Sequence, residues 1–137
     1  MLPSRHMTAK TADFSVKRTN AGLGLIANKA FKKGDFVIEY TGEIIPDEEA
    51  DRRGNRYLFE INGKWTIDGT DRSNLARYIN HSCRPNCEAE FDERAKRIRI
   101  YALKKITPGD ELSYDYGTAH FEEYIKPHGC RCEKCTS

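Results

Sequence analysis

The chain has 137 residues, of which 38% are hydrophobic and 32% are charged, and its formal net charge is +2. This composition excludes a disordered chain, and the length suffices for one domain with its own core. The small net charge gives no reason to expect nucleic-acid binding, and no apolar stretch predicts a membrane helix or a secretion signal. We therefore expect an intracellular protein that contacts neither nucleic acid nor a membrane.

Residues 1–13 are treated as a leader that precedes the folded part of the chain. Within it, Met1–His6 share no pattern with the rest of the sequence, and we interpret them as a vector remnant with Met7 as the natural start. They are excluded from the fold argument.

Short strand-like segments begin at residue 14 and recur along most of the chain. They either alternate apolar and polar residues or are rich in β-branched and aromatic residues, and Asn62-Gly63 between two of them predicts a hairpin. The expected strands are residues 14–16, 25–27, 36–40, 57–61, 65–68, 97–102 and 112–116. The few helical candidates are short: 48–53, 73–79 capped by Ser73, and 120–125 capped by Thr118. The sequence thus predicts a mainly β fold with few short helices.

Charge is distributed unevenly along the chain. Acidic residues concentrate between positions 43 and 51, and basic residues between 94 and 105. Two solvated faces explain this pattern, although the acidic run also suits a surface that attracts a basic peptide.

Three motifs bear on chemistry. Gly22-Leu23-Gly24 predicts either a tight turn or a backbone that a ligand can approach closely. The string 77–87, RYINHSCRPNC, combines uncommon residue types, although a lone histidine or asparagine there would ordinarily cap a turn. In 111–116, ELSYDY, strand periodicity places Tyr114 and Tyr116 on one face. Two adjacent phenols indicate either ordinary packing or the wall of a narrow channel.

The cysteines predict a metal site. Their number is five, which rules out complete internal disulfide pairing, and three of them, Cys130, Cys132 and Cys135, crowd near the end. In a reducing compartment this crowding favours metal binding over disulfides or reactive thiols. A structural zinc ion takes four ligands, so the fourth would be Cys83 or Cys87.

Taken together, these motifs resemble the SET-domain protein-lysine methyltransferases over nearly the whole chain, from Phe14 to Cys135. The glycine pair, Glu39–Glu43, the string 77–87 and the string 111–116 occur in the order typical of that family. The resemblance implies small curved sheets around a pseudoknot, with a SET domain at 14–117 and a post-SET-like zinc-binding tail at 118–137.

The resemblance also implies roles for individual residues. The residues matching the S-adenosylmethionine site are Gly24, Leu25, Ile26, Asn80 and His81. Tyr116 matches the catalytic tyrosine, Tyr57 an aromatic wall of the lysine channel, and Tyr114 a position that is often either Phe or Tyr. The four residues matching the structural zinc site are Cys83, Cys130, Cys132 and Cys135.

The activity implied is S-adenosylmethionine-dependent methylation of lysine in a basic protein such as a histone, mainly to monomethyl-lysine. The alternative is an inactive SET-fold module that only binds peptides. The location expected is the nucleus or chromatin for a eukaryotic protein or an effector, and the cytoplasm for a prokaryotic one. Two departures bear on substrate and metal: the insert between Glu43 and Tyr57 is short, and the last two cysteines are closer together than in many relatives.

Overall fold

The computed structural model describes residues 12–19, 22–55, 57–61 and 64–116. Their strands are β1 (Phe14–Thr19), β2 (Gly22–Ala27), β3 (Phe36–Tyr40), β4 (Glu43–Pro46), β5 (Leu58–Glu60), β6 (Trp65–Asp68), β7 (Asn80–His81), β8 (Cys87–Asp92), β9 (Arg97–Ala102) and β10 (Ser113–Tyr114). The helices are α1 (Asp47–Arg53) and the 3-10 helix η1 (Leu75–Tyr78). The prediction of a mainly β fold with few short helices is confirmed.

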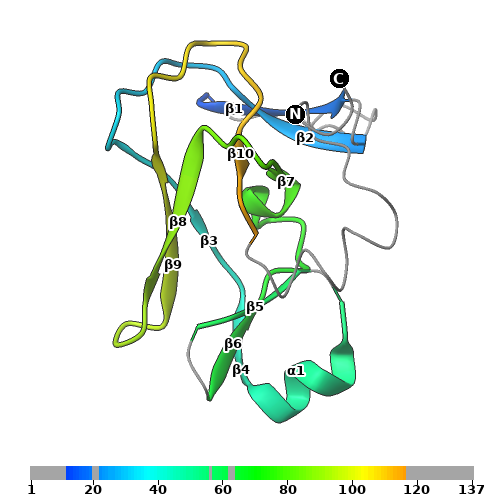
Figure 1. Cartoon of the computed structure of the whole chain (residues 1–137). Helices are drawn as coiled ribbons and strands as arrows, with labels where there is room; N and C mark the ends of the chain where they lie inside the picture. The colour runs from blue at the N-terminus through cyan, green and yellow to red at the C-terminus, as the bar shows by residue number, and fades with distance from the viewer. Residues whose placement is uncertain (1–11, 20–21, 56, 62–63, 117–137) are drawn as a thin grey trace.

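The strands form four small sheets (Figure 1). Antiparallel pairing joins β1 to β2, places β9 between β3 and β8, and places β6 between β4 and β5. The fourth sheet pairs β7 with β10 in parallel, although 31 residues separate the last residue of β7 from the first of β10. This parallel pair therefore brings the two most informative motifs of the sequence side by side.

One helix prediction requires correction, and another cannot be compared with the structure. The predicted helix 73–79 is a single 3-10 segment, and Ser73 does not cap it, because Asn74 occupies the N-cap position without a side-chain cap bond. The Asn74 side chain is committed elsewhere: its Oδ1 accepts from the Thr41 N–H, and its Nδ2 donates to the Gly69 carbonyl. The predicted helix 120–125 lies outside the described residues. By contrast, α1 matches the prediction for 48–53 to within one residue.

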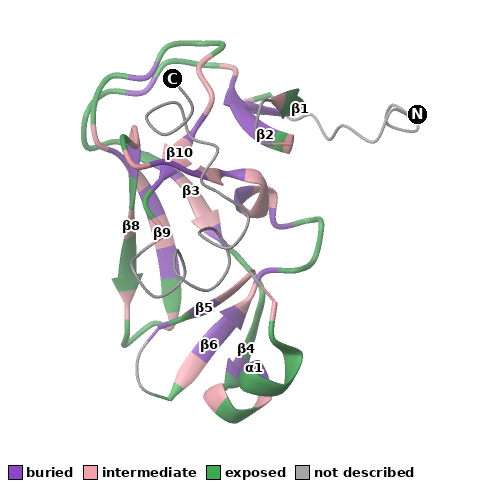
Figure 2. Cartoon of the chain, turned by 45° about the vertical axis from the view of Figure 1, so that its right-hand side comes forward, coloured by how far each residue is buried: buried purple, intermediate pink, exposed green. Residues whose placement is uncertain are grey.

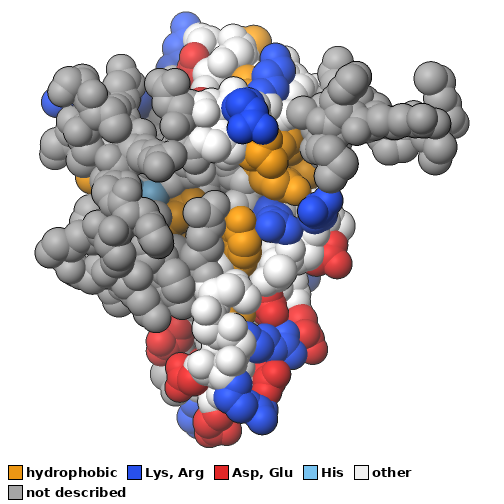
Figure 3. Space-filling view, turned by 90° about the vertical axis from the view of Figure 1, so that its right-hand side faces the viewer, with side chains coloured by type: hydrophobic (Ala, Val, Ile, Leu, Met, Phe, Trp, Pro, Cys, Tyr) orange, Lys and Arg blue, Asp and Glu red, His pale blue; other side chains and the backbone are white. Residues whose placement is uncertain are grey.

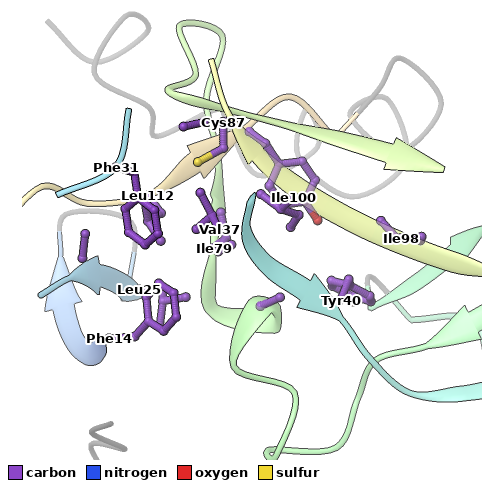
Figure 4. Close-up of a cluster of buried hydrophobic side chains, with 14 of the residues drawn as sticks. Phe14, Leu25, Phe31, Val37, Tyr40, Ile79, Cys87, Ile98, Ile100 and Leu112 are labelled. Carbon is purple, nitrogen blue, oxygen red and sulfur yellow. The ribbon is translucent and has the colours of Figure 1, made fainter. Parts of the chain in front are cut away.

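The core lies where the small sheets meet (Figures 2 and 4). The alternation expected for 97–102 is confirmed, because Ile98, Ile100 and Ala102 of β9 are buried while the residues between them face outward. Strand β8 was not predicted, although its alternation of Glu88 and Glu90 with apolar neighbours is a strand signal. No helix in the described part of the chain is long and apolar enough to cross a membrane.

The segment 111–116 joins the N-terminal hairpin to the string 77–87. On one side, the Leu112 N–H donates to the Leu25 carbonyl at 2.8 Å, and Glu111 forms an isolated antiparallel β-bridge with Ile26. On the other side, Asn86 Nδ2 donates to the Glu111 carbonyl at 2.9 Å, and β10 pairs with β7. Three segments that are distant in sequence therefore converge on one place.

Candidate functional site

Asn80 connects two of the converging segments. Its Nδ2 donates to the Leu23 carbonyl at 3.0 Å and to Glu111 Oε2 at 2.9 Å. The predicted cofactor residues therefore come together, since Leu23 directly precedes Gly24, Leu25 and Ile26 on β2. Leu25 is fully buried in the core, and its carbonyl accepts the Leu112 N–H.

Gly24 lies in a strand at a very close approach to its neighbours. A Cβ added there would be 2.7 Å from both Glu111 Oε2 and Thr19 Cγ2. A tight turn is therefore not the reason for glycine at this position. The groups that approach the Gly24 backbone are the chain's own Glu111 and Thr19 side chains, so the ligand interpretation of the motif stays a prediction, while the positive φ of 100° at Gly22 supports a turn at the start of the motif.

His81 is buried and held in one orientation. Its Nδ1 accepts a hydrogen bond from the Tyr116 backbone N–H at 3.1 Å, so in the neutral ring the proton is on Nε2, which lies 3.6 Å from Cys83 Sγ. Burial lowers the pKa of His81, and the Asp115 carboxylate, 3.9 Å from Nδ1, opposes that shift. A neutral His81 thus fixes the backbone of the predicted catalytic tyrosine.

Two of the predicted channel residues, Tyr114 and Tyr116, belong to one aromatic cluster. The rings of Tyr114 and Tyr116 are 4.9 Å apart, and the Phe59 ring meets Tyr116 edge-on at 5.7 Å. The Tyr116 hydroxyl donates to the Ile79 carbonyl. Tyr116 is therefore held at both its backbone and its hydroxyl.

Two members of this cluster were missed in the sequence. Phe59 is the next residue on the same face after Tyr57 at strand periodicity, and that spacing is a signal that could have identified it. Tyr40 ends β3, and its ring lies 5.1 Å from that of Phe59. The Tyr40 hydroxyl donates to the backbone carbonyl of Tyr57 at 2.8 Å, while the Tyr57 ring itself lies against the Arg77 guanidinium at 4.3 Å.

The environment of Tyr114 and Tyr40 keeps these two phenols neutral. Burial, followed by neighbouring phenols, raises the pKa of both Tyr114 and Tyr40 well above the ordinary value. Neither hydroxyl is therefore a base at neutral pH. An apolar site of this kind disfavours an ammonium group relative to the neutral amine.

A groove of about 290 Å³ lies beside the cluster. Its lining is largely apolar and includes Phe59, Tyr114, Tyr116, Cys87, Ala89 and Phe91, while Glu88 and Asp115 supply the acidic groups. The groove is large enough for side chains of a peptide, and the charged groups among its described lining residues are negative.

Some members of the acidic and basic runs form ion pairs within the molecule. Arg53 of α1 binds Glu43, Glu49 and Asp68 at 3.0, 2.9 and 2.6 Å. Acidic and basic side chains accordingly mingle at the end that carries α1 (Figure 3). In the basic run, Arg99 pairs with Asp92 at 3.2 Å. This pairing supports the interpretation of both runs as solvated faces.

The described part of the zinc site is a single predicted ligand. Cys83 is half-buried beside His81, whereas Cys87 is fully buried, and burial raises the pKa of the Cys87 thiol to about 12. Because Cys87 is packed in the hydrophobic core, it is the poorer candidate for the fourth ligand. Cys130, Cys132 and Cys135 lie outside the described residues. Within the described part of the chain, no group of three or more His, Cys, Asp or Glu is placed to hold a metal.

Comparison with known proteins points to the same family that the sequence motifs resemble. The profile of one protein family, SET domain, matches residues 22–117. The chain is 43% identical over 121 residues to "Histone-lysine N-methyltransferase, H3 lysine-4 specific" of Schizosaccharomyces pombe, covering 80% of this chain and 13% of that protein. It is 39% identical over 124 residues to "Histone-lysine N-methyltransferase trithorax" of Drosophila virilis, covering 83% of this chain and 3% of that protein. It is 35% identical over 131 residues to "Histone-lysine N-methyltransferase ASHR3" of Arabidopsis thaliana, covering 88% of this chain and 26% of that protein. The chain thus spans only a small part of these relatives.

Proposed function

The chain belongs to the SET-domain family, and from this premise we propose that it is an S-adenosylmethionine-dependent protein-lysine N-methyltransferase. The observation that carries the proposal is the contact between the two specific motifs, in which His81 Nδ1 accepts the Tyr116 N–H. Asn80 and His81 are the proposed cofactor-binding pair, and Tyr116 is the proposed catalytic residue. Because they belong to adjacent segments, a bound cofactor and the aromatic cluster would be neighbours.

The residues present fit S-adenosylmethionine. The backbone of Gly24, Leu25 and Ile26 and the side chains of Asn80 and His81 are proposed to hold it, and the bond from Asn80 Nδ2 to the Leu23 carbonyl, which brings the two segments together, supports this proposal. When bound, this cofactor supplies an activated methyl group. The residues of the chain bind and orient both partners and exclude water.

The aromatic cluster suits the acceptor. A lysine amine with an ordinary pKa near 10.4 requires about 4.6 kcal/mol to lose its proton at pH 7. Burial against Tyr57, Tyr114 and Tyr116 reduces that cost, because an apolar site disfavours the charged form. Since the buried phenols are neutral, we propose that water takes the proton and that Tyr116 acts by positioning the amine.

For the substrate, we propose a basic protein such as a histone. The named relatives are histone-lysine methyltransferases, and the acidic groups at the groove, Glu88 and Asp115, suit a basic peptide. We propose the nucleus or chromatin as location for a eukaryotic protein or an effector, and the cytoplasm for a prokaryotic one. Membrane or direct nucleic-acid contact plays no part in the proposal.

Two finer proposals concern product and metal. Tyr114 lies beside Tyr116 and lines the groove, which supports mainly monomethyl-lysine as product.

Residues 14–117 are proposed to be the SET domain and 118–137 a post-SET-like tail, with one structural zinc held by Cys83, Cys130, Cys132 and Cys135. A site with four thiolates has no open position, so the zinc would not take part in catalysis.

The test is incubation of the purified chain with labelled S-adenosylmethionine and basic proteins, followed by mass spectrometry of modified lysines. We expect methyl transfer by the unmodified chain and loss of most of it in Tyr116→Phe. Tyr101→Phe, on the outer face of β9, is the matched control and should remain active. Peptide binding without any transfer would instead identify an inactive binding module.

A further inference from the structure

Glu111 has a side chain at the junction of the two proposed cofactor-binding segments. Its Oε2 accepts from Asn80 Nδ2 at 2.9 Å, and the same oxygen is the atom that a Cβ at Gly24 would approach to 2.7 Å. Its backbone bridges Ile26. Through these three contacts, the carboxylate faces both β2 and β7.

In the part of the chain that the structure describes, Glu111 has no cationic partner. Among the ion pairs of the described residues, none involves Glu111, and its side-chain partner Asn80 is a neutral amide. The residue is half-buried, so it is reachable from solvent while lying against the backbone. A carboxylate accepts several hydrogen bonds, and the Asn80 bond occupies only one of those positions.

The ligand chemistry that suits this position is a cation with several N–H donors. Resting on the function proposed above, we propose that Glu111 binds the α-ammonium group of the methionine part of S-adenosylmethionine, and that Asn80 holds the carboxylate in place. A charge-assisted bond from an ammonium group to a carboxylate is stronger than a bond from a neutral donor. Glu111 is therefore a recognition residue for the amino-acid end of the cofactor.

Calorimetry with S-adenosylhomocysteine, which keeps the ammonium group, tests this proposal without any turnover. We expect Glu111→Gln to weaken binding about ten- to hundredfold, as for the loss of a hydrogen bond to a charged group. The decisive ligand is an analogue in which hydrogen replaces the α-amine. The unmodified chain should bind it more weakly than S-adenosylhomocysteine, and Glu111→Gln should bind it as well as the unmodified chain does.

Controls separate this role from a structural one. Glu90→Gln, an exposed glutamate on β8, should bind both ligands normally, and Glu111→Asp, which retains the charge, should bind S-adenosylhomocysteine better than Glu111→Gln. If Glu111→Gln loses the same factor with both ligands, the carboxylate orients Asn80 or meets the ribose, and the ammonium assignment is wrong. An unchanged Glu111→Gln would also overturn it. Failure of the unmodified chain to bind S-adenosylhomocysteine would overturn the proposed function itself.

Discussion

Replacing Tyr114 with phenylalanine changes the proposed lysine channel by one oxygen atom. The ring is 3% exposed and lies against Tyr116 and Phe59, with ring centroids 4.9 and 6.3 Å away. Within the described residues, no side chain or backbone group hydrogen-bonds the Tyr114 hydroxyl, and the residue lines the groove. Because no protein hydrogen bond is lost, the free energy of unfolding should change by less than about 1 kcal/mol.

The effect on product follows from the same oxygen. A phenol hydroxyl in the groove holds a water or the amine where a second methyl group would have to lie. One such hydrogen bond contributes about 1 kcal/mol, so its removal should favour the second transfer by roughly fivefold relative to the first. We therefore expect Tyr114→Phe to yield more dimethyl-lysine and trimethyl-lysine.

Mass spectrometry of a single-lysine peptide over a time course measures this ratio directly. The unmodified enzyme should accumulate monomethyl-lysine, and Tyr101→Phe should give the same distribution, because that ring packs on Phe36 away from the cluster. Trimethyl-lysine as the dominant early product of the unmodified enzyme would refute the reasoning. An unchanged distribution in an active Tyr114→Phe enzyme would refute it equally.

Three further outcomes are expected. Gly24→Ala should weaken S-adenosylmethionine binding about tenfold in calorimetry, since the new Cβ would be 2.7 Å from two side-chain atoms, and undiminished affinity would mean that the cofactor does not approach this backbone. Tyr40→Phe should lower the free energy of unfolding by about 1 kcal/mol and the melting temperature by about 4 °C, because a buried hydrogen bond to the Tyr57 carbonyl is lost. A melting curve that superposes on that of the unmodified chain would contradict this. Elemental analysis should find close to one zinc per chain, absent in Cys83→Ser and retained in Cys87→Ser, because Cys87 is packed in the core whereas Cys83 is partly exposed. The opposite pattern would assign the fourth ligand to Cys87.

The sequence determined the elements whose signal is local. Alternation in 97–102 predicted which residues of β9 face the core, because side chains of a strand point to opposite faces in turn. The same rule placed Tyr114 and Tyr116 together. The strings 77–87 and 111–116, recognised as motifs, predicted the family and the residues Asn80, His81 and Tyr116 before any geometry was known.

Only the tertiary structure decided how these motifs meet. The parallel pairing of β7 with β10 and the bond from Asn80 to the Leu23 carbonyl join residues far apart in the chain, and no local periodicity encodes such contacts. The same holds for Asn74, whose side chain bonds Thr41 and Gly69 rather than serving the helix that local propensity predicts. Glu111 is the clearest case: in sequence it is one acidic residue among many, and its proximity to Gly24 and Asn80 arises only when three separate segments fold against each other.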